Sequence, residues 1–91
     1  MALGARPECD AASFASLAAW AHEFAPDGTR RGPGADLPRS IALYLRAANL
    51  RADQPGTEDA QGAALANAAE LAVLAGDMNT ARQAGLHGIT L

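Results

Sequence analysis

The sequence has one cysteine, few aromatic side chains, no lysine and no long apolar run, and each shortage excludes a class of protein. Cys9 cannot form a disulfide within the chain, which fits a reducing compartment. No apolar run approaches the length of a membrane span or of a secretory signal, so we expect a cytoplasmic protein with no membrane partner. The seven basic residues are all arginine, the net charge is −3 and no polybasic run occurs, which argues against nucleic acid as a partner.

Alanine is what the chain has in abundance. The 91 residues suit one small domain, 1–91, in which about a quarter of the residues are alanine. An alanine core excludes water only where helices approach closely, because each methyl group buries little apolar area. Such a domain often depends on a neighbour, either further repeats or a second copy of itself. Abundant Ala, Gly and Arg without Lys is typical of GC-rich genomes, so we expect a bacterial origin.

The spacing of apolar residues predicts an all-α fold of about four antiparallel helices. They are expected at about residues 8–25, 37–53, 58–75 and 78–89, with a loop at 26–36. This loop is longer than most connections in compact domains. The predicted architecture is therefore a set of helical hairpins or a four-helix bundle.

The first helix has an apolar face whose residues are spaced three, four and three apart. They are Phe14, Leu17, Ala21 and Phe24. We expect this face to pack into the core. The start of the helix stays open, because Pro7 suits the first helical position and Asp10 suits the capping position. Pro26 disfavours helical geometry at the preceding residue, so the helix is expected to end there.

The second helix, introduced by Asp36 and Pro38, carries apolar residues on two sides. One stripe contains Ile41, Leu45, Ala48 and Ala52, and the other contains Leu43, Ala47 and Leu50. Two stripes require two neighbours, so either the helix is sandwiched within the domain or one stripe is an interface. The residues expected to bind a partner are Leu43, Tyr44, Arg46, Ala47 and Leu50, with Tyr44 and Arg46 as flanking anchors.

The last two helices have recognisable ends. Thr57 is a plausible cap for the third helix, Gly76 suits the left-handed residue that ends it, and Asp77 suits the cap of the fourth. The third helix is expected to bury Leu65, Ala68, Ala69 and Ala72. Gly62 lowers the stability of this helix by about 1 kcal/mol relative to alanine, which suggests that a close backbone contact requires glycine there.

Small and aromatic residues recur at set positions in these helices. They are Phe14, Leu17, Ala18 and Ala21 in the first, Ser40, Tyr44 and Ala47 in the second, and Leu65, Ala69, Gly76 and Ala81 in the last two. In this respect the chain resembles tetratricopeptide repeats, each an antiparallel helix pair of about 34 residues. The resemblance implies stacked hairpins that bind proteins. The loop insertion departs from the repeat, as do Ala72 and Gly85, which stand where large aromatic groups are usual. An unrelated four-helix bundle would share the same helices and faces.

The segment 81–91 supports a different comparison. Its residues Ala81, Gly85, Leu86, Thr90 and Leu91 fall at small, turn-glycine and apolar positions of a helix-turn-helix, and in this it resembles LacI-type repressors. This resemblance implies DNA binding. No Arg or Lys follows Arg82 to contact phosphates, and phosphate contacts supply much of the affinity for DNA. A small DNA-binding regulator is therefore the alternative function.

Residues suited to catalysis are few and scattered. Cys9, Asp10, His22 and His87 lack the spacing of a metal site, so no catalytic, cofactor or metal site is expected. Arg30 and Arg31 suit an anion or a partner's carboxylate, with a solvated loop as the alternative explanation. The sequence thus predicts a non-enzymatic protein–protein interaction or assembly module that recognises helix faces. Self-association into a homo-oligomer, such as a homodimer, is its natural form.

Overall fold

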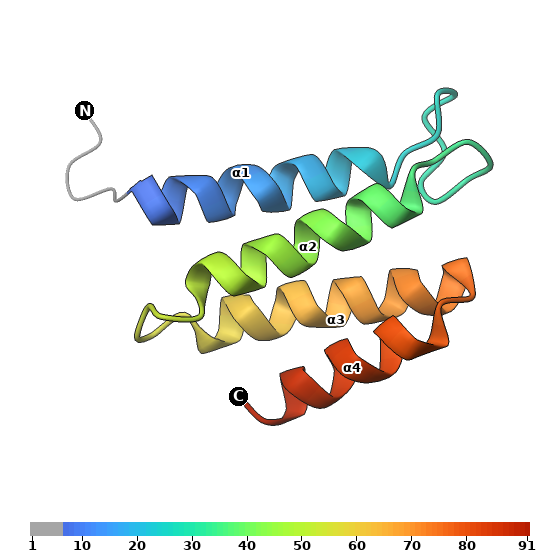
Figure 1. Ribbon diagram of the computed structural model, residues 1–91. Helices are drawn as coiled ribbons and strands as arrows, with labels where there is room; N and C mark the ends of the chain where they lie inside the picture. Colours follow the sequence, from blue (N-terminus) through green and yellow to red (C-terminus); the bar gives the residue numbers. More distant parts are fainter. Residues whose placement is uncertain (1–6) are drawn as a thin grey trace.

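The computed structural model describes residues 7–91 of the chain, with side chains from Ala11 onwards. This part contains four α-helices and no strand, which confirms the all-α prediction (Figure 1). The helices are α1 (Pro7–His22), α2 (Leu37–Arg51), α3 (Glu58–Ala75) and α4 (Met78–Ile89). The bounds of α3 and α4 agree with those predicted, and Pro7, the first described residue, already lies in α1.

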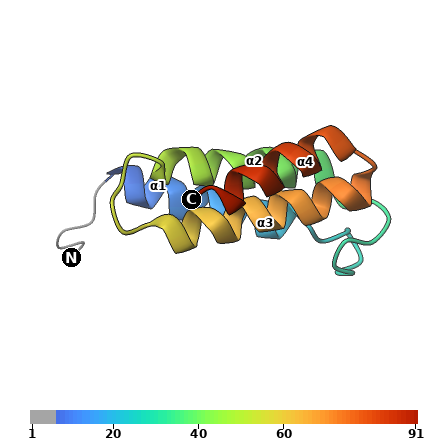
Figure 2. The same cartoon turned by 90° about the horizontal axis from the view of Figure 1, so that it is seen from below.

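Consecutive helices run antiparallel and pack on one another, α1 on α2, α2 on α3 and α3 on α4 (Figure 1). The molecule measures 40 × 32 × 14 Å along its principal axes, and Figure 2 shows how thin this array is when seen from below. α1 and α4 lie at opposite edges of the array. The four helices therefore form an open layer, in which each edge helix keeps one side free of the other helices.

α1 faces the core with the side opposite to the one predicted. Its buried residues are Ala12, Ala15 and Ala19, whereas Phe14 and Leu17 are 71% and 65% exposed. Ala21 is also exposed and Phe24 is only half-buried, so the predicted core face of this helix is wrong. The alanine face lets α1 approach α2 closely enough for the Ser40 hydroxyl to donate a 2.5 Å hydrogen bond to the carbonyl of Ala19.

One apolar core joins all four helices. Most of it lies along α2 and α3, including Ile41, Tyr44, Ala47 and Ala48 of α2 and Ala64, Leu65, Ala68, Leu71 and Ala72 of α3. α2 lies between α1 and α3, so the sandwiched arrangement is the alternative that the structure adopts. Alanines make up most of this core, and the largest core side chain that is fully buried is that of Leu71. Close approach of the helices thus substitutes for bulky side chains.

Local capping chemistry sets most of the helix ends. Asp36 caps α2 by accepting from the backbone N–H of Arg39, Asp77 caps α4 in the same way, and Gly76 adopts φ +79° to end α3. These three predictions are confirmed. Thr57 precedes α3 but makes no side-chain cap bond; its hydroxyl lies 2.9 Å and 2.7 Å from the carbonyl oxygens of Arg51 and Gln54 instead. It therefore helps to close the end of α2.

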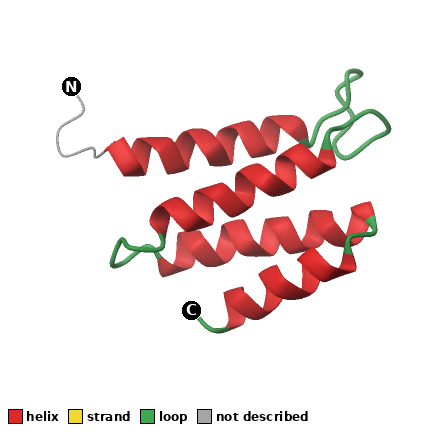
Figure 3. Cartoon of the chain, viewed as in Figure 1, coloured by secondary structure: helices red, strands yellow, loops and turns green. Residues whose placement is uncertain are grey.

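The loop between α1 and α2 begins earlier than predicted and is the largest connection of the fold (Figure 3). α1 ends at His22 and not at Ala25, because Glu23 leaves the helix and Phe24 forms an isolated antiparallel bridge with Arg30. α2 likewise ends at Arg51 and not at residue 53, because a turn begins at Ala52. The loop of residues 23–36 therefore folds back on itself beside the ends of α1 and α2.

Candidate functional site

The predicted partner-binding residues on α2 divide between core and surface. Tyr44 and Ala47 are buried by the neighbouring helices, so neither side chain presents a free surface to a partner. Leu43 and Leu50 are half-buried, and Leu43 packs against the core. Arg46 is exposed beside an open hollow of about 460 Å³ that is also lined by Ala42, Leu45, Asn49 and Leu50. This α2 surface is mixed in polarity and only partly apolar.

The largest apolar side chains on a helix surface lie on α1. We name this surface the α1 face; it consists of Ser13, Phe14, Leu17, Trp20 and Ala21, all of which are exposed. Trp20 is 51% exposed and its ring lies edge-on to that of Phe24, with centroids 4.7 Å apart and planes at 69°. No charged residue occurs between Asp10 and Glu23. The α1 face is thus an apolar, uncharged strip on an edge helix.

One side of the α1 face opens into a groove that runs between α1 and α3. Leu17 and Trp20 form the α1 wall, while Tyr44 and Arg51 of α2 lie at its base. The α3 wall consists of Ala60, Ala63, Ala64 and Asn67. The groove has a volume of about 360 Å³ and is open to solvent. It extends the apolar surface of α1 toward the interior of the array.

A polar cluster closes the end of the molecule where the loop of residues 23–36 meets the helices. Glu23 is fully buried, and its Oε1 accepts from the Nε atoms of Arg31 (2.8 Å) and Arg30 (3.2 Å). Its Oε2 accepts a 2.5 Å hydrogen bond from the hydroxyl of Tyr44. Arg31 also pairs with Glu70 of α3. The two arginines thus bind carboxylates of their own chain, whereas the sequence suggested an external anion, a partner's carboxylate or a solvated loop.

The cluster holds Glu23 in its charged form. Burial alone raises the pKa of this carboxyl group, but hydrogen bonds from Tyr44 and Arg31 and the charges of Arg30 and Arg31 outweigh burial, so its pKa lies below the ordinary value. The same surroundings act on the phenol, since burial and the adjacent Glu23 carboxylate raise the pKa of Tyr44. Both carboxylate oxygens of Glu23 accept hydrogen bonds from side chains of the same chain, so the cluster acts as a structural clamp.

Sequence analysis did not identify Glu23 as a residue of this cluster. The only available signal was an acidic residue seven and eight positions before an arginine pair, and nothing local indicated that it would be buried. Glu70 has an exposed side chain and is paired with Arg31.

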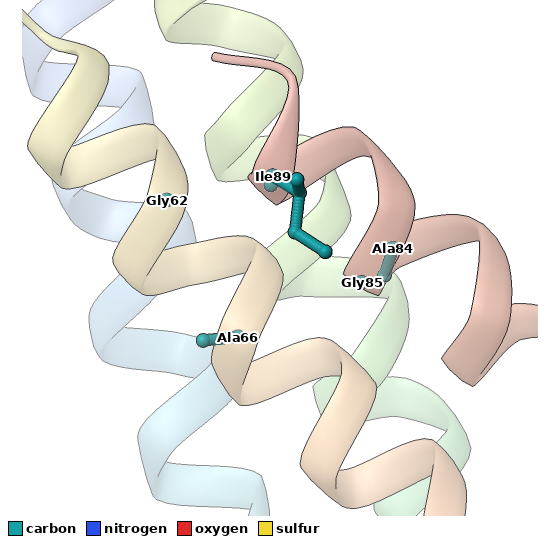
Figure 4. A pocket seen from close by; sticks show the side chains of 6 residues that line it. Gly62, Ala66, Ala84, Gly85 and Ile89 are labelled. Atoms are coloured by element: carbon teal, nitrogen blue, oxygen red, sulfur yellow. The ribbon is translucent and has the colours of Figure 1, made fainter.

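A second cleft lies between α3 and α4 (Figure 4). Its lining is Gly62, Ala66, Ala84, Gly85, Gly88 and Ile89, and its volume is about 280 Å³. The close backbone contact expected at Gly62 is absent there: a Cβ atom added at Gly62 would lie 3.9 Å from Leu91 Cδ1, an ordinary contact distance. No polar side chain lines this cleft, so it offers no groups for chemistry.

The described residues contain no group of three His, Cys, Asp or Glu side chains that could hold a metal ion. His22 and His87 lie on the two edge helices, and the side chains of Cys9 and Asp10 fall outside the described part. Within residues 7–91, none of the helices is both long and apolar enough to cross a membrane. α4 continues without a break through Gly85, where the LacI-type motif has its turn.

Comparison with protein-family models, with curated proteins and with solved structures found no match to this chain. The candidate site therefore depends on the chain's own geometry, and the α1 face is its most distinctive feature.

Proposed function

We propose that this chain is a non-enzymatic protein–protein interaction module that binds its partner through the α1 face. The observation that carries the proposal is an inversion: α1 buries alanines and exposes Phe14, Leu17 and Trp20. A helix of a self-sufficient domain buries its large apolar residues and presents charges to solvent. Contiguous exposed apolar surface, with charged residues depleted, is typical of the centre of an interface.

The arrangement of the helices supports a tetratricopeptide-like reading within the same proposal. Antiparallel helices stacked in an open layer are what repeat proteins use to build extended binding surfaces. Leu17 and Trp20 stand on one wall of the groove between α1 and α3, so a bound segment would meet both the face and the groove. Leu43 and Leu50 of α2, which are both half-buried, are secondary contacts in the proposal.

The test uses two leucines of similar exposure on the two edge helices. Leu17 is 65% exposed on α1 and Leu86 is 58% exposed on α4, so Leu17→Glu and Leu86→Glu make a matched pair. Each protein is immobilised at low density and incubated with lysate of the source organism, and retained proteins are identified by mass spectrometry. A protein that wild type and Leu86→Glu retain, but Leu17→Glu does not, supports the proposal. Equal retention by all three chains contradicts it.

A further inference from the structure

We propose that the occupant of the α1 face is a second copy of this chain, with the two α1 helices packed antiparallel about a two-fold axis. This inference rests on the proposed function, because it names the partner of the same surface. A two-fold interface requires a surface that is complementary to itself. The α1 face meets this requirement through its lack of charge and its alternation of large and small residues, and its exposed area sets the expected strength of the pairing.

Charge is the first argument. Residues 11–22 of α1 include no Asp, Glu, Lys or Arg, so a partner surface that carries an unpaired charge would lose its hydration there without compensation. A second α1 face carries no such charge. Two other exposed surfaces carry an arginine: Arg46 lies on the outside of α2, and Arg82 lies between Met78 and Leu86 among the exposed apolar residues of α4. Of these surfaces, the α1 face is the one best suited to pack against a second copy of itself.

The order of large and small residues is the second argument, and it favours the antiparallel direction. Phe14, Leu17 and Ala21 are spaced three and four apart, as along the seam of two packed helices. In an antiparallel pair centred near Ala19, Leu17 of one copy meets the small Ala21 of the other, and Phe14 meets the region of Phe24. A parallel pair would place Ala21 against Ala21 and leave a void. Antiparallel packing therefore fills the seam more evenly.

The exposed area is the third argument, and it sets the strength of the pairing. Taking about 200 Å² for each large side chain, the exposed fractions of Phe14, Leu17 and Trp20 amount to roughly 400 Å² per chain. A standard interface buries about 800 Å² per partner. Ser13, Ala21 and the edge of the groove add to the smaller figure, so the pair falls at the weak end of specific interfaces. We expect a dissociation constant of roughly 100 µM.

Sedimentation equilibrium of the full chain, from about 5 µM to about 1 mM, tests the pairing. Wild type and Leu86→Glu should pass from monomer to dimer, while Leu17→Glu should associate at least about 100-fold more weakly, because the pair would bury an unpaired carboxylate. Far-ultraviolet circular dichroism checks that all three keep their helices. A wild type that stays monomeric, or a Leu86→Glu chain that loses the dimer equally, overturns the inference. Leu17-dependent capture of a different protein would then still support the proposed function.

Disulfide trapping tests the direction of the two helices. In a Cys9→Ser background, Leu17→Cys and Ala21→Cys chains are oxidised separately and as a mixture. The antiparallel pair predicts that the mixed 17–21 disulfide forms faster than either self-disulfide. Faster 17–17 and 21–21 disulfides would indicate a parallel pair and overturn the proposed geometry.

Discussion

The hydroxyl of Tyr44 donates a 2.5 Å hydrogen bond to Oε2 of Glu23 and so ties the middle of α2 to the residue that follows α1. The other carboxylate oxygen of Glu23 accepts from Arg30 and Arg31, and Arg31 continues to Glu70 on α3. One buried carboxylate thus connects the long loop to α2 and, through Arg31, to α3. This set of contacts, the Glu23 clamp, holds the C-terminal end of α1 and the long loop against α2 and α3.

Replacing the phenol tests the clamp directly. Tyr44→Phe keeps the ring but leaves Oε2 of buried Glu23 without its hydrogen-bond donor. We expect a loss of about 1–3 kcal/mol in the free energy of unfolding, the usual cost of an unsatisfied buried acceptor. Urea denaturation followed by circular dichroism measures it. A loss below about 0.5 kcal/mol, within the range of neutral surface substitutions, would show that the bond contributes little.

Stability in acid should depend on Glu23. Because its folded-state pKa lies below the unfolded value of 4.5, the carboxylate stabilises the fold fully above that pH, and the contribution is lost as the pH falls through the folded pKa. Glu23→Gln should therefore lower stability at neutral pH and flatten the decline below about pH 5. Asp53→Asn, which removes an exposed carboxylate in the turn after α2, should keep the wild-type decline. Parallel pH profiles for all three proteins would contradict this role.

The two loop arginines should differ in importance. The Arg31 side chain is 18% exposed and pairs with both Glu23 and Glu70, whereas that of Arg30 is 52% exposed and, among residues 7–91, pairs only with Glu23. We expect Arg31→Ala to cost about 1–3 kcal/mol, as for a partly buried charge-assisted pair. Arg30→Ala should cost at most about 1 kcal/mol, as for an exposed ion pair. Thermal or urea unfolding decides, and equal costs would mean that the bridge to α3 adds nothing.

Replacement by alanine should have opposite effects on stability at two glycines, Gly85 and Gly76. Gly85 lies inside α4 with no atom near the position of an added Cβ, so Gly85→Ala should stabilise the fold by about 0.5–1 kcal/mol. Gly76 also has space, but its φ of +79° disfavours a side chain, so Gly76→Ala should destabilise by about 1–2 kcal/mol. Melting temperatures compare the two. A stabilised Gly76→Ala variant would show that the end of α3 readily adopts another geometry.

The number of helices, the bounds of α3 and α4 and three helix ends were predictable because they depend on neighbouring residues. Asp36, Gly76 and Asp77 act over one turn of chain, which local rules describe well. The orientation of α1 was not predictable in the same way. Both of its faces are apolar and no charge between Asp10 and Glu23 marks the solvent side, so the larger side chains were assigned to the core. Packing against α2 selected the alanine face instead.

The Glu23 clamp could not be predicted from local sequence patterns, because its partners are distant in the sequence. Glu23 meets partners seven, eight and 21 residues away, and Arg31 meets Glu70 at a separation of 39 residues. No periodic pattern encodes such contacts. The predicted α2 site had the same difficulty, since Tyr44 and Ala47 share a helix surface that two neighbouring helices cover.

The central claim is that another copy of the chain covers the α1 face, and Trp20, the only tryptophan, reports on that face directly. Its fluorescence can be recorded while the protein is diluted from about 500 µM to about 1 µM, a range that spans a dissociation constant of roughly 100 µM. We predict blue-shifted, poorly quenched emission at high concentration and red-shifted, acrylamide-accessible emission on dilution, with Leu17→Glu red-shifted throughout. Emission and quenching that are independent of concentration, and the same in Leu17→Glu, would contradict the claim.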